Sequence, residues 1–436
     1  MRDFLSDDVR RRESVIGIIK RVYERYGFEP LETPAVGNIE TLLGKYGDEG
    51  NQLIFKILKR GEHEATGQAD LALRYDLTVP LARVVAQYQS KLPRLFKRYQ
   101  IQPVWRADRP ARGRFREFYQ CDVDSLGSIA PAVEAELCAA VSDALIELGF
   151  NDFVIRINHR ELLTAILRRA GVGAHQENDA LIALDKLDKI GPKGVDAELA
   201  NRGIEEQARN ALLQVFLRDV NEGDSLARVA VFVIGDEAGQ QAVVNLQAIT
   251  GLTEQTNAAG KLRFDPSLAR GLSYYTGAIM EINVADLAGS LGGGGRYDNL
   301  VGMFLGQNIP ACGFSLGLER ILVVMSERNM FPPTLATTPA DVMIATFDPS
   351  GAGAAMRLAA MLRKGGLRVL VYPDAEKIGK QIKYADSRGI PFVALLGEDE
   401  INAGTVTVKN LSAQTQATYD QSAAGAAIRE GLKQRG

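Results

Sequence analysis

One basic loop organises this sequence, and it is written Arg106-Ala107-Asp108-Arg109-Pro110-Ala111-Arg112-Gly113-Arg114-Phe115-Arg116. The flanking stretches, about 95–105 and 115–123, have the composition of strands, so the segment predicts a long antiparallel hairpin. On the second strand Gln120, Asp122 and Asp124 share one face, because successive side chains point to opposite sides. The hairpin would place guanidinium groups, which bind phosphate, beside carboxylates. Taken alone, the loop is better interpreted as a solvated charged surface.

The composition indicates an ordinary globular protein of more than one domain. At 436 residues the chain exceeds the size of a single hydrophobic core, and two or three domains are expected. The formal net charge of −3 argues at first against a nucleic-acid partner. Between Arg94 and Arg116, however, Asp108 is the single acid among many basic residues. Binding to RNA depends on such local basic surfaces rather than on the total charge.

Cysteines and histidines are few, and the sequence predicts neither disulfides nor a metal site made by protein ligands alone. They are Cys121, Cys138, Cys312, His63, His159 and His175. The cysteines are odd in number and form no C-x-x-C pattern, so we expect buried thiols. No two histidines have the spacing of metal ligands. The first residues carry acids where a signal peptide needs basic and apolar residues, and we therefore expect a cytoplasmic protein.

Periodicity predicts the order of elements in the first 330 residues. Helices are expected from Ser6 to a stop at Gly27, and over 79–88, 131–148 and 316–328, with strands over 71–75, 153–158, 262–264 and 272–282. The polar helical sequence at about 171–245 indicates an inserted helical module. The run Gly292–Gly295 is either a cradle that approaches a ligand with its backbone or a turn between a strand and a helix. It matches neither a P-loop nor a Rossmann fingerprint.

A second domain is expected after a proline-rich linker. We assign residues 1–330 to a first domain, 331–339 to the linker and 340–436 to the second domain. Strand and helix patterns alternate there, with strands at 342–346, 368–372, 391–396 and 405–408 and helices at 354–364 and 377–386. Such alternation predicts an α/β domain with a mostly parallel sheet.

Five segments together resemble class II aminoacyl-tRNA synthetases, and specifically the histidyl-tRNA synthetase family, over nearly the whole chain. The segments are Gly27–Pro34 (motif 1), Arg106–Phe118 (motif 2), Gly313–Arg320 (motif 3), and the histidine-specific Arg270–Gly277 and Gly292–Asp298. The resemblance implies an α+β catalytic domain built on an antiparallel sheet, with the helical insertion, followed by an α/β anticodon-binding domain. It implies a homodimeric histidine–tRNA ligase that forms histidyl-adenylate and pyrophosphate from histidine and ATP, then transfers histidine to the terminal adenosine of its tRNA.

Carried over position by position, the resemblance also assigns the site. Histidine would bind Asp76, Leu77, Thr78, Gln120, Asp124, Arg270, Tyr274, Tyr275 and Tyr297. ATP, with Mg²⁺, would bind Arg106, Arg114, Arg116 and Arg320, and the catalytic residues would be Arg106 and Arg270. Lys377, Lys380, Lys383 and Arg388 would contact tRNA, although a solvated amphipathic helix is the alternative for that segment taken alone.

One position departs from the family pattern, and two other functions remain open. Ser273 stands where the family usually has Asp, and on a strand it would face away from Arg270. The same fold also serves a non-catalytic regulatory partner of a short ATP phosphoribosyltransferase, and it could serve as an RNA-binding protein with an inactive synthetase domain. The three site arginines Arg106, Arg270 and Arg320, together with the C-terminal domain, favour the enzyme.

Overall fold

The computed structural model describes residues 1–44, 52–61, 66–216, 225–269, 274–332, 335, 338–374 and 376–434. Contacts between residues divide the chain into two compact units. The first contains Met1–Asp3 and Arg12–Met330, and the second contains Phe4–Arg11 and Phe331–Gly436. Within the described part, no helix is long and apolar enough to cross a membrane.

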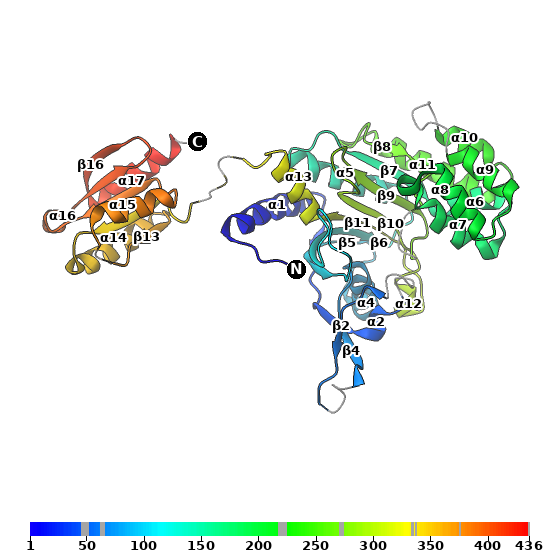
Figure 1. Ribbon diagram of the computed structural model, residues 1–436, viewed down its shortest axis with the longest axis horizontal. Coiled ribbons are helices and arrows are strands. Elements are labelled where there is room, and N and C mark those ends of the chain that lie inside the picture. Colours follow the sequence, from blue (N-terminus) through cyan, green and yellow to red (C-terminus); the bar gives the residue numbers. More distant parts are fainter. Residues whose placement is uncertain are drawn as a thin grey trace. The chain divides into compact units, whose positions relative to one another are not determined.

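The first unit is built on an eight-stranded sheet with the order β1-β5-β6-β11-β10-β9-β7-β8 (Figure 1). The strands are β1 (Glu29–Pro30), β5 (Phe96–Trp105), β6 (Glu117–Leu126), β7 (Val154–His159), β8 (Leu262–Phe264), β9 (Ala278–Asn283), β10 (Gly292–Arg296) and β11 (Ala311–Gly317). Only the pairs at the two edges, β1 with β5 and β7 with β8, are parallel among these strands. The predicted antiparallel sheet is therefore confirmed.

The basic hairpin forms the second and third strands from one edge of this sheet. β5 and β6 pair without a register shift from Phe96↔Leu126 to Trp105↔Glu117. The loop closes where the Arg106 amide donates to the Arg116 carbonyl at 2.9 Å. That bond ends the hairpin ladder, so β6 begins at Glu117, two residues later than expected.

The helices of the first unit lie on the sheet and in the helical segment, except that α1 up to Arg11 is counted in the second unit. They are α1 (Ser6–Arg25), α2 (Ile39–Leu42), α4 (Thr78–Tyr88), η2 (Gln89–Lys91), α5 (Ala132–Glu147), α6 (Arg160–Ala170), η3 (Ala174–Gln176), α7 (Glu177–Leu184), α8 (Leu187–Asn201), α9 (Glu206–Phe216), α10 (Ser225–Phe232), α11 (Glu237–Thr253), α12 (Gly302–Leu305) and α13 (Leu318–Glu327). α8 bends at Gly191, where φ is 66° and Pro192 follows. α5 and α13 pack on β6, and α11 packs on α5 and α6. The described residues of the segment predicted to be helical are thus mostly in helices, and α11 continues beyond it to Thr253.

A small sheet with the order β2-β4-β3 stands beside α4. Its strands are β2 (Val36–Asn38), β3 (Lys56–Leu58) and β4 (Ala69–Leu73). Val79, Leu81 and Ala82 of α4 share one buried cluster with Tyr274 and Tyr297. This cluster brings the chain before α4 to the same face of the large sheet as the two tyrosines.

Three local expectations differ from the structure. The run Gly292–Gly295, expected to be either a ligand cradle or a turn, is a strand in the middle of the sheet. Glycine is needed because a Cβ at Gly292 or Gly294 would overlap a backbone carbonyl of β11. Of the strand expected over 272–282, the described part begins at Ala278. Ser273 lies outside the described residues, so its expected orientation stays a prediction. The helix expected from Leu316 begins at Leu318, because β11 continues to Gly317.

The second unit has a five-stranded sheet with the order β13-β12-β14-β15-β16. Its elements are β12 (Val342–Thr346), η4 (Pro349–Gly351), α14 (Ala352–Lys364), β13 (Val369–Val371), α15 (Ile378–Ser387), β14 (Phe392–Leu396), α16 (Glu398–Ala403), β15 (Thr405–Asn410), β16 (Thr415–Asp420) and α17 (Gln421–Lys433). β13, β12 and β14 are parallel, but β14, β15 and β16 are antiparallel. The expectation of a mostly parallel sheet was wrong, because β16 follows β15 through a connection too short for a crossover.

Candidate active site

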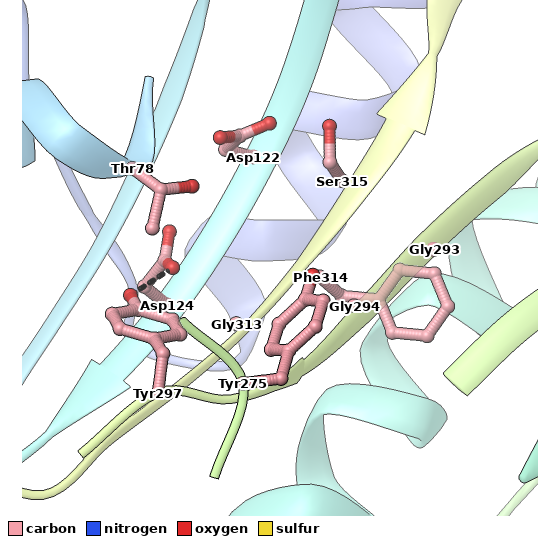
Figure 2. A pocket seen from close by; sticks show the side chains of 10 residues that line it. All are labelled: Thr78, Asp122, Asp124, Tyr275, Gly293, Gly294, Tyr297, Gly313, Phe314 and Ser315. Carbon is pink, nitrogen blue, oxygen red and sulfur yellow. Dashed lines mark hydrogen bonds between the residues drawn. The ribbon is translucent and has the colours of Figure 1, made fainter. Parts of the chain in front are cut away.

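A small pocket lies between β6, β10 and β11 (Figure 2). Its lining residues are Thr78, Asp122, Asp124, Tyr275, Gly293, Gly294, Tyr297, Gly313, Phe314 and Ser315. The cavity that these residues enclose is small, about 20 Å³, which is room for about one water molecule. Binding of a larger molecule therefore requires the surrounding side chains to move. Gly293 and Gly294 approach it with their backbone, as one of the two interpretations of the glycine run predicted.

Asp124 is a buried residue that lines this pocket, and three neighbours hold its carboxylate in place. Its Oδ2 lies 2.9 Å from Arg98 Nη2, and the Tyr297 hydroxyl donates a hydrogen bond to Oδ1 (Figure 2). Gly313 faces it from β11, where a Cβ would overlap the carboxylate. Burial raises the pKa of Asp124, and Arg98 opposes that shift. Arg98 itself is fully buried, so it does not belong to a basic surface.

Asp122 lies on the same face of β6, two residues from Asp124. It is 2% exposed, and its nearer oxygen is 3.9 Å from Arg98 Nη2. Burial raises its pKa to about 7, against the opposing effects of Arg98 and a hydrogen bond with Ser315. The sequence placed Asp122 on this face but assigned it no role. The alternation of polar residues along β6 was the signal that could have found it.

The segment before α4 is joined to the same site by hydrogen bonds. Asp76 Oδ1 accepts from the Val79 amide at 3.1 Å, which holds the start of α4. The Tyr274 hydroxyl donates to Asp76 Oδ2 at 3.3 Å. The Leu77 carbonyl accepts from Arg98 Nη2 at 3.3 Å. The structure thus brings together Asp76, Leu77, Thr78, Asp124, Tyr274, Tyr275 and Tyr297.

Gln120 is the remaining polar residue of this face. Its Nε2 donates to Ser315 Oγ at 3.0 Å. Its Oε1 is buried and has no hydrogen-bond partner among the described residues. The amide of Gln120 is therefore oriented so that its oxygen can accept a hydrogen bond from a ligand. Ser315, which fixes that orientation, was not identified as a site residue from the sequence.

Arg106 is held rigidly beside the pocket-forming segment. Its guanidinium lies over the rings of Tyr75, at 4.2 Å, and Phe118, at 5.2 Å. Its Nε donates to the Tyr75 carbonyl at 3.0 Å. These contacts fix the direction of a cation whose remaining donors can bind an anion.

Arg320 lies where the basic loop meets α13. It donates to the Ser290 carbonyl, and its Cγ would be 3.2 Å from a Cβ on Gly113 of the loop. The helix is fixed by Glu319, which accepts from Arg12 at 2.7 Å and from the Tyr119 amide at 2.8 Å. This role of Glu319 was not apparent from the sequence.

The other arginines of the loop are exposed. Arg114 and Arg116 point to solvent, as binding of an external anion requires. Arg112 instead pairs with Glu327 and donates to the Asp286 carbonyl at 3.0 Å. Arg270, the second predicted catalytic residue, lies outside the described residues. In the described part no group of three His, Cys, Asp or Glu side chains could hold a metal ion.

The predicted tRNA-binding residues are all exposed in the second unit. Lys377, Lys380, Lys383 and Arg388 lie on α15 or next to its ends. Lys380 also pairs with Glu376 at 3.1 Å. Tyr372 and Tyr384 form an edge-to-face pair, with ring centroids 5.4 Å apart. Tyr384 is 39% exposed, so this surface combines positive charge with an accessible ring.

Comparisons with known proteins agree over the whole chain. A family model described as histidyl-tRNA synthetase matches residues 1–321, and one described as anticodon binding domain matches 341–431. The chain is 42% identical to a histidine–tRNA ligase of Christiangramia forsetii, over 96% of both chains. It is 40% identical to that of Gloeobacter violaceus, over 98% of this chain and 97% of the relative.

Solved structures give the same result. The histidyl-tRNA synthetase of Nostoc sp. PCC 7120 is 30% identical, with a TM-score of 0.81 over 98% of this chain and 97% of that one. A Bacillus halodurans protein described as an ATP phosphoribosyltransferase regulatory subunit/histidyl-tRNA synthetase is 21% identical, with a TM-score of 0.74 over 91% and 95% of the two chains. At that identity the second likeness concerns the fold alone.

Proposed function

Because the chain belongs to the histidyl-tRNA synthetase family and is a histidine–tRNA ligase that uses ATP, we propose which of its residues perform each step. Histidine binds in the pocket between β6 and β11, and ATP binds between the basic loop and α13. The observation that carries this assignment is the buried Asp124, held by Arg98 and Tyr297 in a small pocket that Thr78, Asp122 and Ser315 also line. Such a site holds one small polar molecule in a fixed orientation.

Histidine offers an ammonium group and an imidazole ring whose two nitrogens need hydrogen-bond partners. Asp76, Thr78, Gln120 and Asp124 supply oxygen acceptors, and the hydroxyls of Tyr274 and Tyr297 orient two of the carboxylates. Tyr275 and Tyr297 provide aromatic walls, and Leu77 holds Arg98 through its carbonyl. Arg270 would face the substrate carboxylate.

ATP would contact the arginines outside the pocket. Arg106, fixed by Tyr75 and Phe118, would hold the α-phosphate. Arg320 would lie against the nucleotide, and the exposed Arg114 and Arg116 would neutralise the outer phosphates together with Mg²⁺. Arg106 and Arg270 are thus the proposed catalytic residues.

The activation step requires alignment more than proton transfer. The histidine carboxylate attacks the α-phosphorus, its oxygen forms the new bond, and pyrophosphate leaves with the electrons of the broken P–O bond. A carboxylate is already ionised at neutral pH and needs no general base. Fixed arginines therefore accelerate the step by stabilising the negative charge that develops on the phosphate.

In the second step the tRNA would be held by the second unit. Lys377, Lys380, Lys383 and Arg388 would contact phosphates, and Tyr384 would stack on an unpaired base. We propose a homodimer, supported by apolar residues that the small sheet leaves exposed, Val36 at 38% and Leu58 at 53%. A place in the cytoplasm, where tRNA is charged, fits this function.

Two measurements test the assignment. The protein should catalyse histidine-dependent exchange of labelled pyrophosphate into ATP, and it should esterify a histidine-accepting tRNA. A non-catalytic regulatory protein of the same fold would do neither. Exchange without esterification would place the fault in the proposed tRNA surface rather than in the pocket.

A further inference from the structure

The pocket contains a carboxylate that the assignment above does not use. We propose that Asp122 is a specificity-determining residue, whose unpartnered oxygen receives a protonated nitrogen of the amino acid, so that the substrate supplies the positive charge that the buried cluster lacks. This inference rests on the proposed function, because it takes the pocket as the histidine site.

The first argument is the imbalance of buried charge. Asp122 and Asp124 are each 2% exposed, and among the described residues the guanidinium within 4 Å of them is that of Arg98. One nitrogen of Arg98 faces both, at 2.9 Å from Asp124 but 3.9 Å from Asp122. Asp76, 1% exposed, adds a third acid to the same region. Buried carboxylates without a close cation are unfavourable, so the cluster favours a cationic ligand or a proton.

The second argument is the direction of the free acceptor. Asp122 Oδ1 is buried and has no hydrogen-bond partner among the described residues. Asp122 lines the pocket next to Ser315 (Figure 2). Gln120 Oε1, another buried acceptor without a hydrogen-bond partner among the described residues, belongs to the same face of β6. Native proteins satisfy most buried polar atoms. Unmet acceptors on this one face of β6 indicate a ligand rich in N–H donors.

The pH dependence of binding follows from the neighbours of Asp122. The charged groups near it are Arg98 from β5, Asp124 on its own strand, Asp76 before α4 and, more weakly, Arg74 after β4, while β11 contributes the neutral Ser315. The pKa of Asp122 in the free protein is about 7. A cationic ligand binds the ionised form. For the ammonium group, which stays charged well above pH 7, affinity should be greatest above pH 7 and fall by up to about tenfold per pH unit below it. For the ring, whose own pKa is about 6.5, affinity should also fall above pH 7.

The test compares two isosteric substitutions on one strand, Asp122→Asn and Asp124→Asn. Asp122→Asn should weaken histidine binding by about 10- to 100-fold, the loss of one charged hydrogen bond, and should flatten its pH dependence near 7. The Michaelis constant for ATP should stay unchanged. Because Asp122→Asn removes a poorly compensated buried charge, the melting temperature of the ligand-free protein at pH 8 should stay equal or rise. Asp124→Asn should lower the melting temperature, because Arg98 and Tyr297 lose the carboxylate that they contact.

Unchanged histidine affinity in Asp122→Asn, or a fall in melting temperature as large as that of Asp124→Asn, would overturn the proposal. Triazolylalanine, which keeps the ammonium group but has a ring that stays neutral, identifies the nitrogen that Asp122 receives. If Asp122→Asn weakens histidine but not triazolylalanine, the ring is the donor. If it weakens both equally, the donor is the ammonium. Failure of the unaltered protein to exchange pyrophosphate with histidine would reject the proposed function instead.

Discussion

Arg296 Nε donates to the buried Glu134 carboxylate at 2.6 Å, and this pair joins the end of β10 to the start of α5. The backbone carbonyl of Arg296 also accepts from the Thr276 amide at 2.8 Å, directly after the paired tyrosines. One residue thus holds Tyr297 and the 274–276 segment together. The support for the pocket lies in contacts that touch no substrate.

Replacing Arg296 with Ala should therefore destabilise the protein strongly. Glu134 would remain buried without its cation, which costs about 3–5 kcal/mol. Urea unfolding followed by circular dichroism measures the change in free energy of unfolding. Arg25→Ala is the control, because Arg25 and Glu147 form an exposed pair, with Arg25 56% exposed, and such pairs contribute about 1 kcal/mol or less. Equal losses in the two variants would contradict this account.

Gly313→Ala should weaken histidine binding without changing ATP binding. The added methyl group would overlap the Asp124 carboxylate, so the carboxylate must move or the strands must separate. Overpacking of this kind costs about 1–3 kcal/mol, and we expect the Michaelis constant for histidine to rise. Gly251→Ala in α11 is the matched control, since nothing lies within 4 Å of its added Cβ. An unchanged Michaelis constant for histidine in Gly313→Ala would show that Asp124 is not a binding residue.

Arg106→Ala should slow histidyl-adenylate formation by about 10²–10³, the usual effect of removing a preorganised electrostatic donor. Arg106→Lys should restore little, because lysine lacks the planar guanidinium that lies over Tyr75 and Phe118. Pyrophosphate exchange in folded protein is the measurement. Arg109→Ala, an exposed change in the same loop, should leave the rate near normal. A normal rate in Arg106→Ala would reject its catalytic role.

Stability should fall in mild acid because of His159. Its Nδ1 accepts from the Glu161 amide at the start of α6, which requires the neutral ring. Burial, together with the charge of Arg296, lowers the pKa of His159 from 6.5 to about 4. The unfolded chain then binds more protons between these values, so this contribution is complete above pH 6.5 and is lost towards pH 4.

Melting temperatures across that pH range test the contribution. His159→Asn keeps an oxygen that can accept from the Glu161 amide but cannot titrate. As the pH falls from 6.5 towards 4, the melting temperature of the unaltered protein should fall more than that of the variant. A difference that does not depend on pH would show that His159 does not titrate in this range.

Lys380→Glu combined with Lys383→Glu should impair charging of tRNA while pyrophosphate exchange stays normal. Both side chains are exposed on α15, away from any buried contact. Each lost phosphate contact should lower the slope of log affinity against log salt by roughly one. Arg357→Glu on α14 is the control, because it also replaces an exposed basic residue of the same unit with an acid. Equal losses from both changes would indicate a general effect of charge rather than a surface on α15.

The sequence by itself determined the hairpin, the antiparallel sheet and the division of polar and apolar faces on β6. These features depend on local chemistry, because alternation along a strand and turn residues in a loop act over a few positions. The same reasoning failed at Gly292–Gly295, where four glycines carry no strand propensity of their own. Close approach of β11 on one side and β9 on the other makes that segment a strand.

Only the tertiary structure decided the chemistry of the pocket. Nothing near Asp122 or Asp124 in the sequence shows that one has a close cation and the other does not. That difference arises because the register of β5 and β6 sets Arg98 opposite Asp124, and because Gly313 of β11 leaves room for one carboxylate. Residues far apart in the chain thus fix the charge and solvation of each carboxylate, and burial makes those neighbours decisive.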